Sequence, residues 1–531
     1  MKSSAVFGAR HIRTGVRVWL PVLILTLLAA GCTPLVELVV PTATLAPTAT
    51  PLFTATVAPQ PTPAAAASPV AVEDPWLLQE KALRPADRGD LALLEGPTRY
   101  RLELTLDPDG PRLWGQASIS YTNNEPLPLP EFYLRLYPNM DDAHGGGTEI
   151  TQVTLDGRPV TPGYELQRTA LRLPLDPPLE PGAVLEVGMD LAVSVPRGEG
   201  GNYGTFAFER GVLALAHFYP FVPVYDDEGW NVEIPPTYGD IIYGDMSLYD
   251  VTLTVPEEMV AVATGSALSL VANSDGTATY HFVSGPARDF NLVLSPDYEL
   301  TRRQVDDVTV NSYYLPGDVD GGEVVLDVAS EALRLFGQRF GRYPYAELDL
   351  VPTFTSAAGI EYPGLIVIAQ RLYAGSSLSE WVVAHEVAHQ WWYNLVGNDQ
   401  VDEPWLDEAL TQYTTVLYFE DRYDKATAAS ALQAGIEERW EGARDAGRDR
   451  PVVGPVAGFA PEDYGPIVYG KGPLFVHHLR EEVGDVAFDH ILRTYFQEYR
   501  YKIATGESFL AVAERFSSRD VDALYRQWIL E

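Results

Sequence analysis

The chain is nearly free of cysteine, with Cys32 as the single thiol in 531 residues. One thiol cannot form an intramolecular disulfide, and it cannot close the thiolate shell of a structural zinc site. Basic residues are also scarce, because 37 Lys and Arg stand against 73 Asp and Glu, which gives a formal charge of −36. Such an acidic balance argues against nucleic acid as a partner and against electrostatic docking to anionic lipid.

The remaining composition is that of a globular protein, with 46% hydrophobic and 21% charged residues. A chain of 531 residues exceeds one typical domain, so we expect two folded units. Residues 88–305 contain repeated apolar alternation, which predicts a largely antiparallel β domain. Residues 306–531 have mainly helical periodicity, with strands expected near 348–351 and 364–369. The predicted fold class is therefore α+β, with the two units packed tightly because no Pro-rich linker separates them.

The N-terminus has the pattern of an export signal. Four basic residues precede the apolar run 18–30, which is too short for a comfortable membrane span. The run ends in Leu-Ala-Ala-Gly-Cys, which resembles a bacterial lipoprotein box with Cys32 as the lipidated residue. We therefore predict a signal peptide over 1–31 and an extracytoplasmic protein, lipid-anchored to the outer face of the bacterial cell membrane. An uncleaved signal anchor is the alternative.

Residues 32–75 are rich in Pro, Thr and Ala and carry almost no charge. Such a segment cannot bury a core, and its proline content favours an extended, semi-rigid conformation. It predicts a tether between the lipid anchor and the folded units.

The most informative motif is His-Glu-Val-Ala-His at 385–389. Residues four apart share one face of a helix, so His385 and His389 can bind one cation, while Glu386 lies beside it. A helix is expected over 378–395, which lacks Gly and Pro, with Gly397 as its stop.

A third ligand is expected at Glu408, near the start of a second helix whose first turn is Asp402, Glu403 and Pro404. Two neutral imidazoles and one carboxylate hold zinc with one position open, as catalytic sites do. The pattern predicts one Zn²⁺ per chain. The alternative is a chance match in a core helix, with Glu408 as a surface acid.

The remaining histidines of interest, His217, His477 and His478, show no ligand spacing with a partner, so core or surface roles are expected for them.

Three motifs together resemble the gluzincin zinc peptidases of the aminopeptidase N and leukotriene hydrolase kind. Glu408 follows His389 after eighteen residues, as in that family. The sequence Gly-Ile-Glu-Tyr at 359–362 is similar to its Gly-x-Met-Glu-Asn exopeptidase motif, with Ile360 in place of Met and Tyr362 in place of Asn. Tyr-Gly-Lys-Gly at 469–472 resembles its Tyr-x-Lys-Gly motif.

The resemblance spans roughly residues 90–531 and implies a saddle-like β domain followed by a thermolysin-like catalytic domain. It also implies roles for single residues. Glu386 would act as general base, and Tyr469 would donate a hydrogen bond to the oxyanion. Glu361 would pair with the free α-amine of the substrate, and main-chain groups near Gly359 and Ile360 would align the substrate as an added strand. An ordinary edge acid and a packed tyrosine remain the alternatives for Glu361 and Tyr469.

The predicted function is a zinc aminopeptidase that removes N-terminal residues from peptides outside the cell. Only about 120 residues follow Glu408, so a short form without the family's C-terminal helical domain and with a more open cleft is expected. The alternatives are a zinc endopeptidase with the same ligands, and a non-catalytic surface binding protein on a peptidase scaffold. The sequence predicts neither the preferred first residue nor the oligomeric state.

Overall fold

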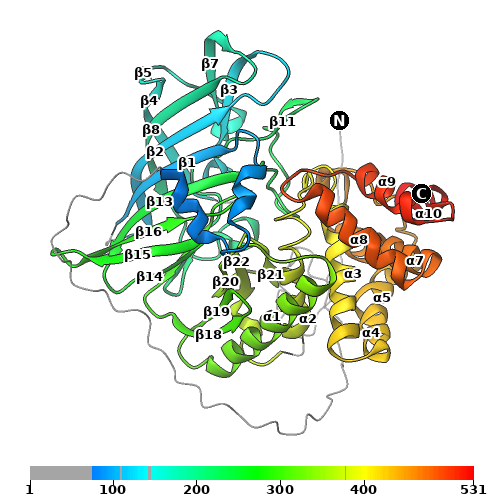
Figure 1. The fold of residues 1–531 in the computed structure, drawn as a ribbon. Coiled ribbons are helices and arrows are strands. Elements are labelled where there is room, and N and C mark those ends of the chain that lie inside the picture. Colours follow the sequence, from blue (N-terminus) through cyan, green and yellow to red (C-terminus); the bar gives the residue numbers. More distant parts are fainter. Residues whose placement is uncertain (1–74, 108–109, 141–144, 377) are drawn as a thin grey trace, which may run out of the picture. The chain divides into compact units, whose positions relative to one another are not determined.

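The computed structural model describes residues 75–107, 110–140, 145–376 and 378–531 (Figure 1). The predictions of a signal peptide over 1–31, of lipidation at Cys32 and of a tether over 32–75 fall outside these residues, apart from Pro75. Of the helices in the described ranges, none has the length and apolar character that a membrane span requires.

The first part of the described chain is built from β-sheets (Figure 1). The largest sheet has eight strands in the order β15-β16-β13-β1-β2-β8-β4-β5. Its strands are β1 (Thr98–Leu106), β2 (Arg112–Thr122), β4 (Gly147–Leu155), β5 (Arg158–Pro159), β8 (Val184–Ser194), β13 (Ser247–Pro256), β15 (Ser266–Ala272) and β16 (Thr277–Val283). Tyr100, Leu102 and Leu104 of β1 are buried, as their alternation predicts.

Three smaller sheets complete this part. They contain β3 (Leu129–Arg135), β7 (Ala170–Leu179) and β6 (Gly163–Glu165); β14 (Val260–Ala263), β17 (Leu292–Ser295), β10 (Val212–Leu215) and β9 (Phe206–Glu209); and β11 (Tyr225–Asp226) with β12 (Gly229–Trp230). The pairings are antiparallel, except that β1 runs parallel to β13, with Thr98 opposite Ser247. The predicted, largely antiparallel β domain is thus confirmed.

A mixed five-stranded sheet, in the order β18-β19-β20-β22-β21, begins the second part. It consists of β18 (Glu299–Val305), β19 (Val308–Tyr314), β20 (Glu347–Thr353), β21 (Gly359–Ile360) and β22 (Leu365–Ala369). Strands β20 and β22 correspond to the two strands expected in the helical region. The antiparallel pair β18 and β19 spans the boundary predicted at 305/306, because alternation does not reveal which sheet a hairpin joins. The domain limits therefore stay a prediction.

Helices make up the rest of the second part (Figure 1). They are α1 (Val319–Arg339), α2 (Ser379–Ala388), α3 (Trp405–Arg422), α4 (Lys425–Leu432), α5 (Glu438–Asp445), α6 (Pro461–Pro466), α7 (Gly472–Val483), α8 (Asp485–Tyr499), α9 (Gly506–Phe516) and α10 (Val521–Tyr525), with π-helical turns η7 (Gln433–Glu437), η9 (Ile467–Lys471) and η10 (Arg526–Leu530). The predicted α+β fold class, with a β-rich part preceding a helical part, is confirmed.

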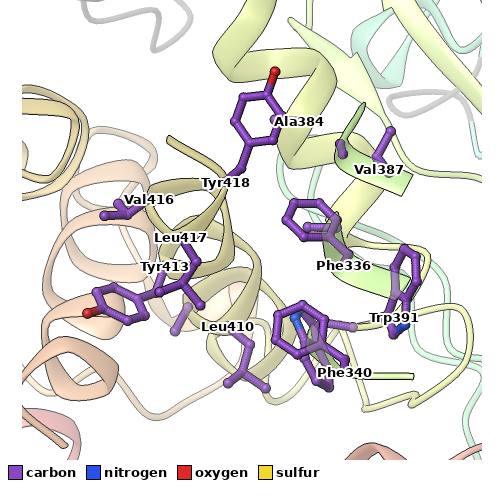
Figure 2. Close-up of a cluster of buried hydrophobic side chains, with 14 of the residues drawn as sticks. Phe336, Phe340, Ala384, Val387, Trp391, Leu410, Tyr413, Val416, Leu417 and Tyr418 are labelled. Atoms are coloured by element: carbon purple, nitrogen blue, oxygen red, sulfur yellow. The ribbon is translucent and has the colours of Figure 1, made fainter. Parts of the chain in front are cut away.

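The helices that carry the predicted zinc ligands share one apolar core with α1 (Figure 2). Its members include Phe336 and Phe340 of α1, Ala384 and Val387 of α2, Trp391, and Leu410, Tyr413, Val416, Leu417 and Tyr418 of α3. Helices α2 and α3 therefore keep their separation through packing on the side away from the ligands.

The helix predicted over 378–395 is shorter than expected, because α2 ends at Ala388. Beyond it, the carbonyl groups of Tyr393 and Asn394 accept hydrogen bonds of 2.7 and 3.0 Å from Nε of Arg288. A distant guanidinium therefore engages backbone groups that a continued helix would hold inside itself. The composition of residues 378–395 could not reveal this interaction with Arg288.

Gly397 is not a helix stop, which corrects the second part of that prediction. A Cβ atom at this position would collide with the guanidinium of Arg288. Arg288 is fully buried and also donates to the carbonyl oxygens of Gly244, at 2.9 Å, and of Lys502, at 2.7 Å. One side chain of the β part thus holds three separate segments in place.

The residues before β1 form two 3₁₀ helices, η1 (Pro75–Ala82) and η2 (Arg88–Leu93), that touch both parts of the fold. Nη1 of Arg84 donates to the carbonyl oxygen of Tyr343 at 3.2 Å. The hydroxyl of Tyr501 donates to Asp90 at 2.8 Å. Leu83 is 1% exposed and belongs to the core of the helical part. This segment is therefore part of the folded body, although the β domain was predicted to begin at residue 88.

Replacement of Leu83 by Ala should lower the free energy of unfolding by about 2 to 4 kcal/mol, because it leaves a cavity in a closed core. Leu93 lies in the same segment and is 57% exposed, so Leu93→Ala is the matched control. Urea unfolding of the two variants measures the difference. Equal stability of both would show that the segment does not belong to the core.

Candidate active site

His385 of α2 and His389, the residue directly after this helix, lie on the same side, as the spacing predicts. Their Nε2 atoms lie 3.1 Å apart. Glu408 stands in the first turn of α3, and its Oε2 atom lies 3.4 Å from Nε2 of His385 and 3.5 Å from Nε2 of His389. The structure thus brings the three predicted ligands together, with one donor atom of each facing the others.

The donor atoms fit a zinc ion. Nδ1 of His389 lies 3.0 Å from the carbonyl oxygen of Trp392, which can only accept, so this nitrogen carries the proton and Nε2 offers a lone pair. Oε2 of Glu408 is buried without a hydrogen-bond partner among the described residues. Tetrahedral zinc with bonds of 2.0 to 2.1 Å places its ligand atoms about 3.3 Å apart, close to the measured separations.

The charges at this cluster also favour a cation. Burial lowers the pKa of His385, which keeps its imidazole neutral. Burial acts in the same direction on His389, but the carboxylates of Glu361 and Glu408 outweigh it and raise the pKa of that ring. Burial opposes ionisation of Glu408, yet His389 and His385 lower its pKa. The ionised carboxylate of Glu408 thus lies against the two imidazoles, and a divalent ion there would neutralise it.

Glu386 lies beside the ligands and against the backbone of β21. A Cβ atom at Gly359 would collide with the Glu386 carboxylate, so only glycine leaves room for the side chain. Burial, and then the negative charge of Glu361, raise the pKa of Glu386, which suits a base that works near neutral pH. Since β21 is the last strand in the order of its sheet, an extended peptide can be added alongside it.

Glu361 follows β21 and is 6% exposed. Its Oε1 atom accepts a hydrogen bond of 3.1 Å from Nε2 of Gln400, and burial raises its pKa. Donor atoms of Glu361, His389 and Asp407 lie within 4.8 Å of one another. The carboxylate therefore stands at the ligand cluster.

The segment that carries Glu361 is tied to α2 by Gln390, the residue directly after His389. Nε2 of Gln390 donates to the carbonyl oxygen of Tyr362 at 3.2 Å, and its Oε1 accepts from the amide of Gly364 at 2.9 Å. The position of Glu361 relative to the ligands is thereby set by the ligand helix itself.

Tyr469 lies in η9, which follows the three ligands along the chain, and its side chain reaches the cluster. Its hydroxyl donates a hydrogen bond of 2.6 Å to Oε1 of Glu408. Lys471 of the same motif points elsewhere, because its Nζ atom lies 3.0 Å from Oδ1 of Asp449 and donates to the carbonyl oxygen of Arg450 at 2.9 Å. In this motif the tyrosine faces the site and the lysine holds a neighbouring loop.

A cavity opens next to Glu361, between the two parts of the fold. Its lining includes His217, Asp240 and Ile242 from the β part, and Ile360 and Tyr362 from the second part. Ile360 therefore faces the cavity beside Glu361, the residue predicted to bind the substrate α-amine. Burial and the charge of Glu361 raise the pKa of Asp240.

Two polar residues at the site carried no signal in the sequence. Gln400 donates to Glu361 and, at 2.7 Å, to Oδ2 of Asp407, so a neutral amide bridges two buried acids. Asp240 lies far from the motifs along the chain. No spacing rule connects either residue to the metal ligands, and only the fold brings them there.

The other histidines have different surroundings. His217 is 3% exposed, and its Nε2 atom lies 3.1 Å from Oδ2 of Asp289, which confirms a core role. His477 and His478 are half-buried on α7, in a group with Glu481 whose donor atoms lie within 4.8 Å of one another. The prediction that these two show no ligand spacing was wrong, because Glu481 lies three and four residues further along the helix, while their core or surface role stays a prediction.

Comparison with known proteins agrees with this geometry. Residues 324–528 match the peptidase family M1 domain. The chain is 27% identical over 299 residues to aminopeptidase M1-B of Oryza sativa subsp. japonica, covering 53% of this chain and 34% of that protein. It is 31% identical over 194 residues to aminopeptidase B of Rattus norvegicus, covering 34% of this chain and 29% of that protein. The chain thus spans about a third of the length of these curated relatives.

A solved structure with the same fold is the M1 zinc metallopeptidase from Deinococcus radiodurans, with a TM-score of 0.64 and 21% identity. The likeness covers 82% of this chain and 93% of that one. The fold is thus that of a known M1 zinc metallopeptidase, and the family match covers all the predicted zinc ligands. Residues 324–528 of the chain are thus similar to the peptidase family M1 domain, and the fold is that of a solved M1 zinc metallopeptidase.

Proposed function

We propose that the chain is a zinc aminopeptidase that removes N-terminal residues from peptides. The observation that carries the proposal is the position of Glu361. Its carboxylate lies within 4.8 Å of a donor atom of His389, so a substrate amine bound to Glu361 would hold the first peptide bond at the metal ligands. The edge strand β21 also supports the proposal, because an extended peptide can bind alongside it.

His385, His389 and Glu408 would hold the ion. Zinc bound there would polarise the scissile carbonyl and make a water acidic enough to react at neutral pH. Glu386 would take the proton of the attacking water and deliver it to the leaving amine, for which its raised pKa is suited. The Tyr469 hydroxyl, now donating to Glu408, would turn to the developing oxyanion.

Peptides are the proposed substrates. Aminopeptidases are among the relatives, and a variant of the Deinococcus radiodurans enzyme has been solved with a Tyr-Ser-Ala substrate bound. A small cavity of about 20 Å³ adjoins the site proposed for the α-amine, which is room for about one water molecule.

The proposed location is extracytoplasmic, with a lipid anchor at Cys32 on the bacterial cell membrane. The charged start, the apolar run and the Leu-Ala-Ala-Gly-Cys sequence support it. Incorporation of labelled palmitate into the wild-type chain, and its loss in Cys32→Ser, would test the anchor.

Glu386→Gln should lower kcat by about 10²- to 10⁴-fold, because the amide cannot take the proton of the attacking water. Zinc content should stay unchanged, since Glu386 is not a ligand. Glu380 lies on the same helix and accepts hydrogen bonds from Tyr418 and Tyr423 instead, so Glu380→Gln is the matched control. Unchanged turnover in Glu386→Gln would remove Glu386 as the base, and no turnover in either the wild-type chain or the variant would support a non-catalytic binding protein.

Acetylation of the substrate α-amine should lower kcat/KM by about 10- to 100-fold, because Glu361 then loses a charged partner and stays buried. Fluorogenic aminoacyl substrates and their N-acetyl forms measure this ratio. Glu361→Gln should reduce cleavage of the free-amine substrate and shrink the difference between the two. Equal cleavage of both substrates by the wild-type protein would point to an endopeptidase.

A further inference from the structure

Helix α7 carries a second cluster of metal-binding side chains, formed by His477, His478 and Glu481. Nδ1 of His478 lies 2.8 Å from Oε2 of Glu481, and Nε2 of His477 lies 3.8 Å from Oε1 of the same carboxylate. One donor atom of each residue lies within 4.8 Å of the other two. None of the three belongs to the catalytic ligand set.

One of these two distances is shorter and the other is longer than the distance between two ligand atoms bound to zinc. Ligand atoms bound tetrahedrally at 2.0 to 2.2 Å stand about 3.3 Å apart. Rotation about the side-chain bonds of Glu481, which is 60% exposed, would change the distances from its carboxylate to both imidazoles.

Each imidazole is held in place by a neighbour from another helix. Nδ1 of His477 lies 3.2 Å from the hydroxyl of Tyr413 on α3, so a ring protonated on Nδ1 donates to that oxygen and leaves Nε2 free for a metal. His478 stacks on Trp528 of η10, with ring centroids 4.6 Å apart. Orientation of both rings before binding lowers the entropic cost of assembling a site.

The charges around the cluster also favour a cation. Burial and the carboxylates of Glu441 and Glu481 raise the pKa of Glu437 in η7, so another acid lies near the cluster. Arg480 is occupied by Glu420, in a bidentate pair of 2.7 and 2.8 Å.

We propose that His477, His478 and Glu481 form a second zinc site, on the surface of α7 and separate from the catalytic centre. A pair of imidazoles with one carboxylate selects Zn²⁺ over Ca²⁺ and Mg²⁺, which prefer oxygen ligands. Water completes the shell. His477 contacts α3 and His478 contacts η10. A metal bound to both residues would therefore fix the position of α7 relative to α3 and η10.

The test is the number of zinc ions per chain, measured on the full chain by equilibrium dialysis against Zn²⁺ and elemental analysis. The wild-type chain should bind two ions, and both Glu481→Gln and His478→Ala should bind one. Glu481→Gln keeps an exposed side chain of the same size, so loss of folding does not obscure the result. His490→Ala is the matched control, because His490 lies on α8 and stacks on Phe516 away from the cluster.

A variant that cannot bind the catalytic ion distinguishes the two zinc sites. His389→Ala should lose one ion and keep the other with unchanged affinity, whether or not the chain hydrolyses peptides. A single ion in the wild-type chain, or two ions in both Glu481→Gln and His478→Ala, would overturn the proposal.

Discussion

The arrangement of the catalytic domain depends on the burial of several carboxylates around two imidazoles. Glu361, Glu386, Asp407 and Glu408 are each 6% exposed or less. The hydrogen bonds described for these acids come from amides and a phenol, namely those of Gln400, Asn398 and Tyr469. Buried acids with neutral donors are costly unless a cation joins them. A zinc ion at His385, His389 and Glu408 meets that requirement, so the same ion that would supply the chemistry would also stabilise the packing of α2 against α3.

Arg288 transmits a second constraint from the β part to this centre. Its guanidinium binds the carbonyl groups that follow α2 and also those of Gly244 and Lys502. Removal of this side chain would take away a hydrogen bond from each of these carbonyl groups, although that of Lys502 also accepts from the amide of Gly397 at 3.0 Å. The end of the ligand helix is therefore determined by a residue about a hundred positions earlier. This explains why the β part and the helical part form one body around the site instead of two independent units.

Features that depend on short spacing along the chain could be predicted from the sequence. The ligand set follows from helical periodicity, and Glu408 follows from the start of a second helix. The strands of the β part follow from alternation. Features that depend on distant partners could not be predicted in this way. The parallel pairing of β1 with β13, the early end of α2 and the glycine at 397 all result from contacts between remote segments. Gln400 and Asp240 reach the site for the same reason.

The central claim is that hydrolysis at a free N-terminus depends on one zinc ion held by His385, His389 and Glu408. Titration of the metal-free chain with Zn²⁺, followed by the rate of release of the first residue from a tripeptide, tests it most directly. The account predicts no release without metal, and a rate that rises with occupancy of the site and returns to zero with a chelator. Release of residues that is independent of Zn²⁺, or no release from the zinc-loaded chain, would contradict it.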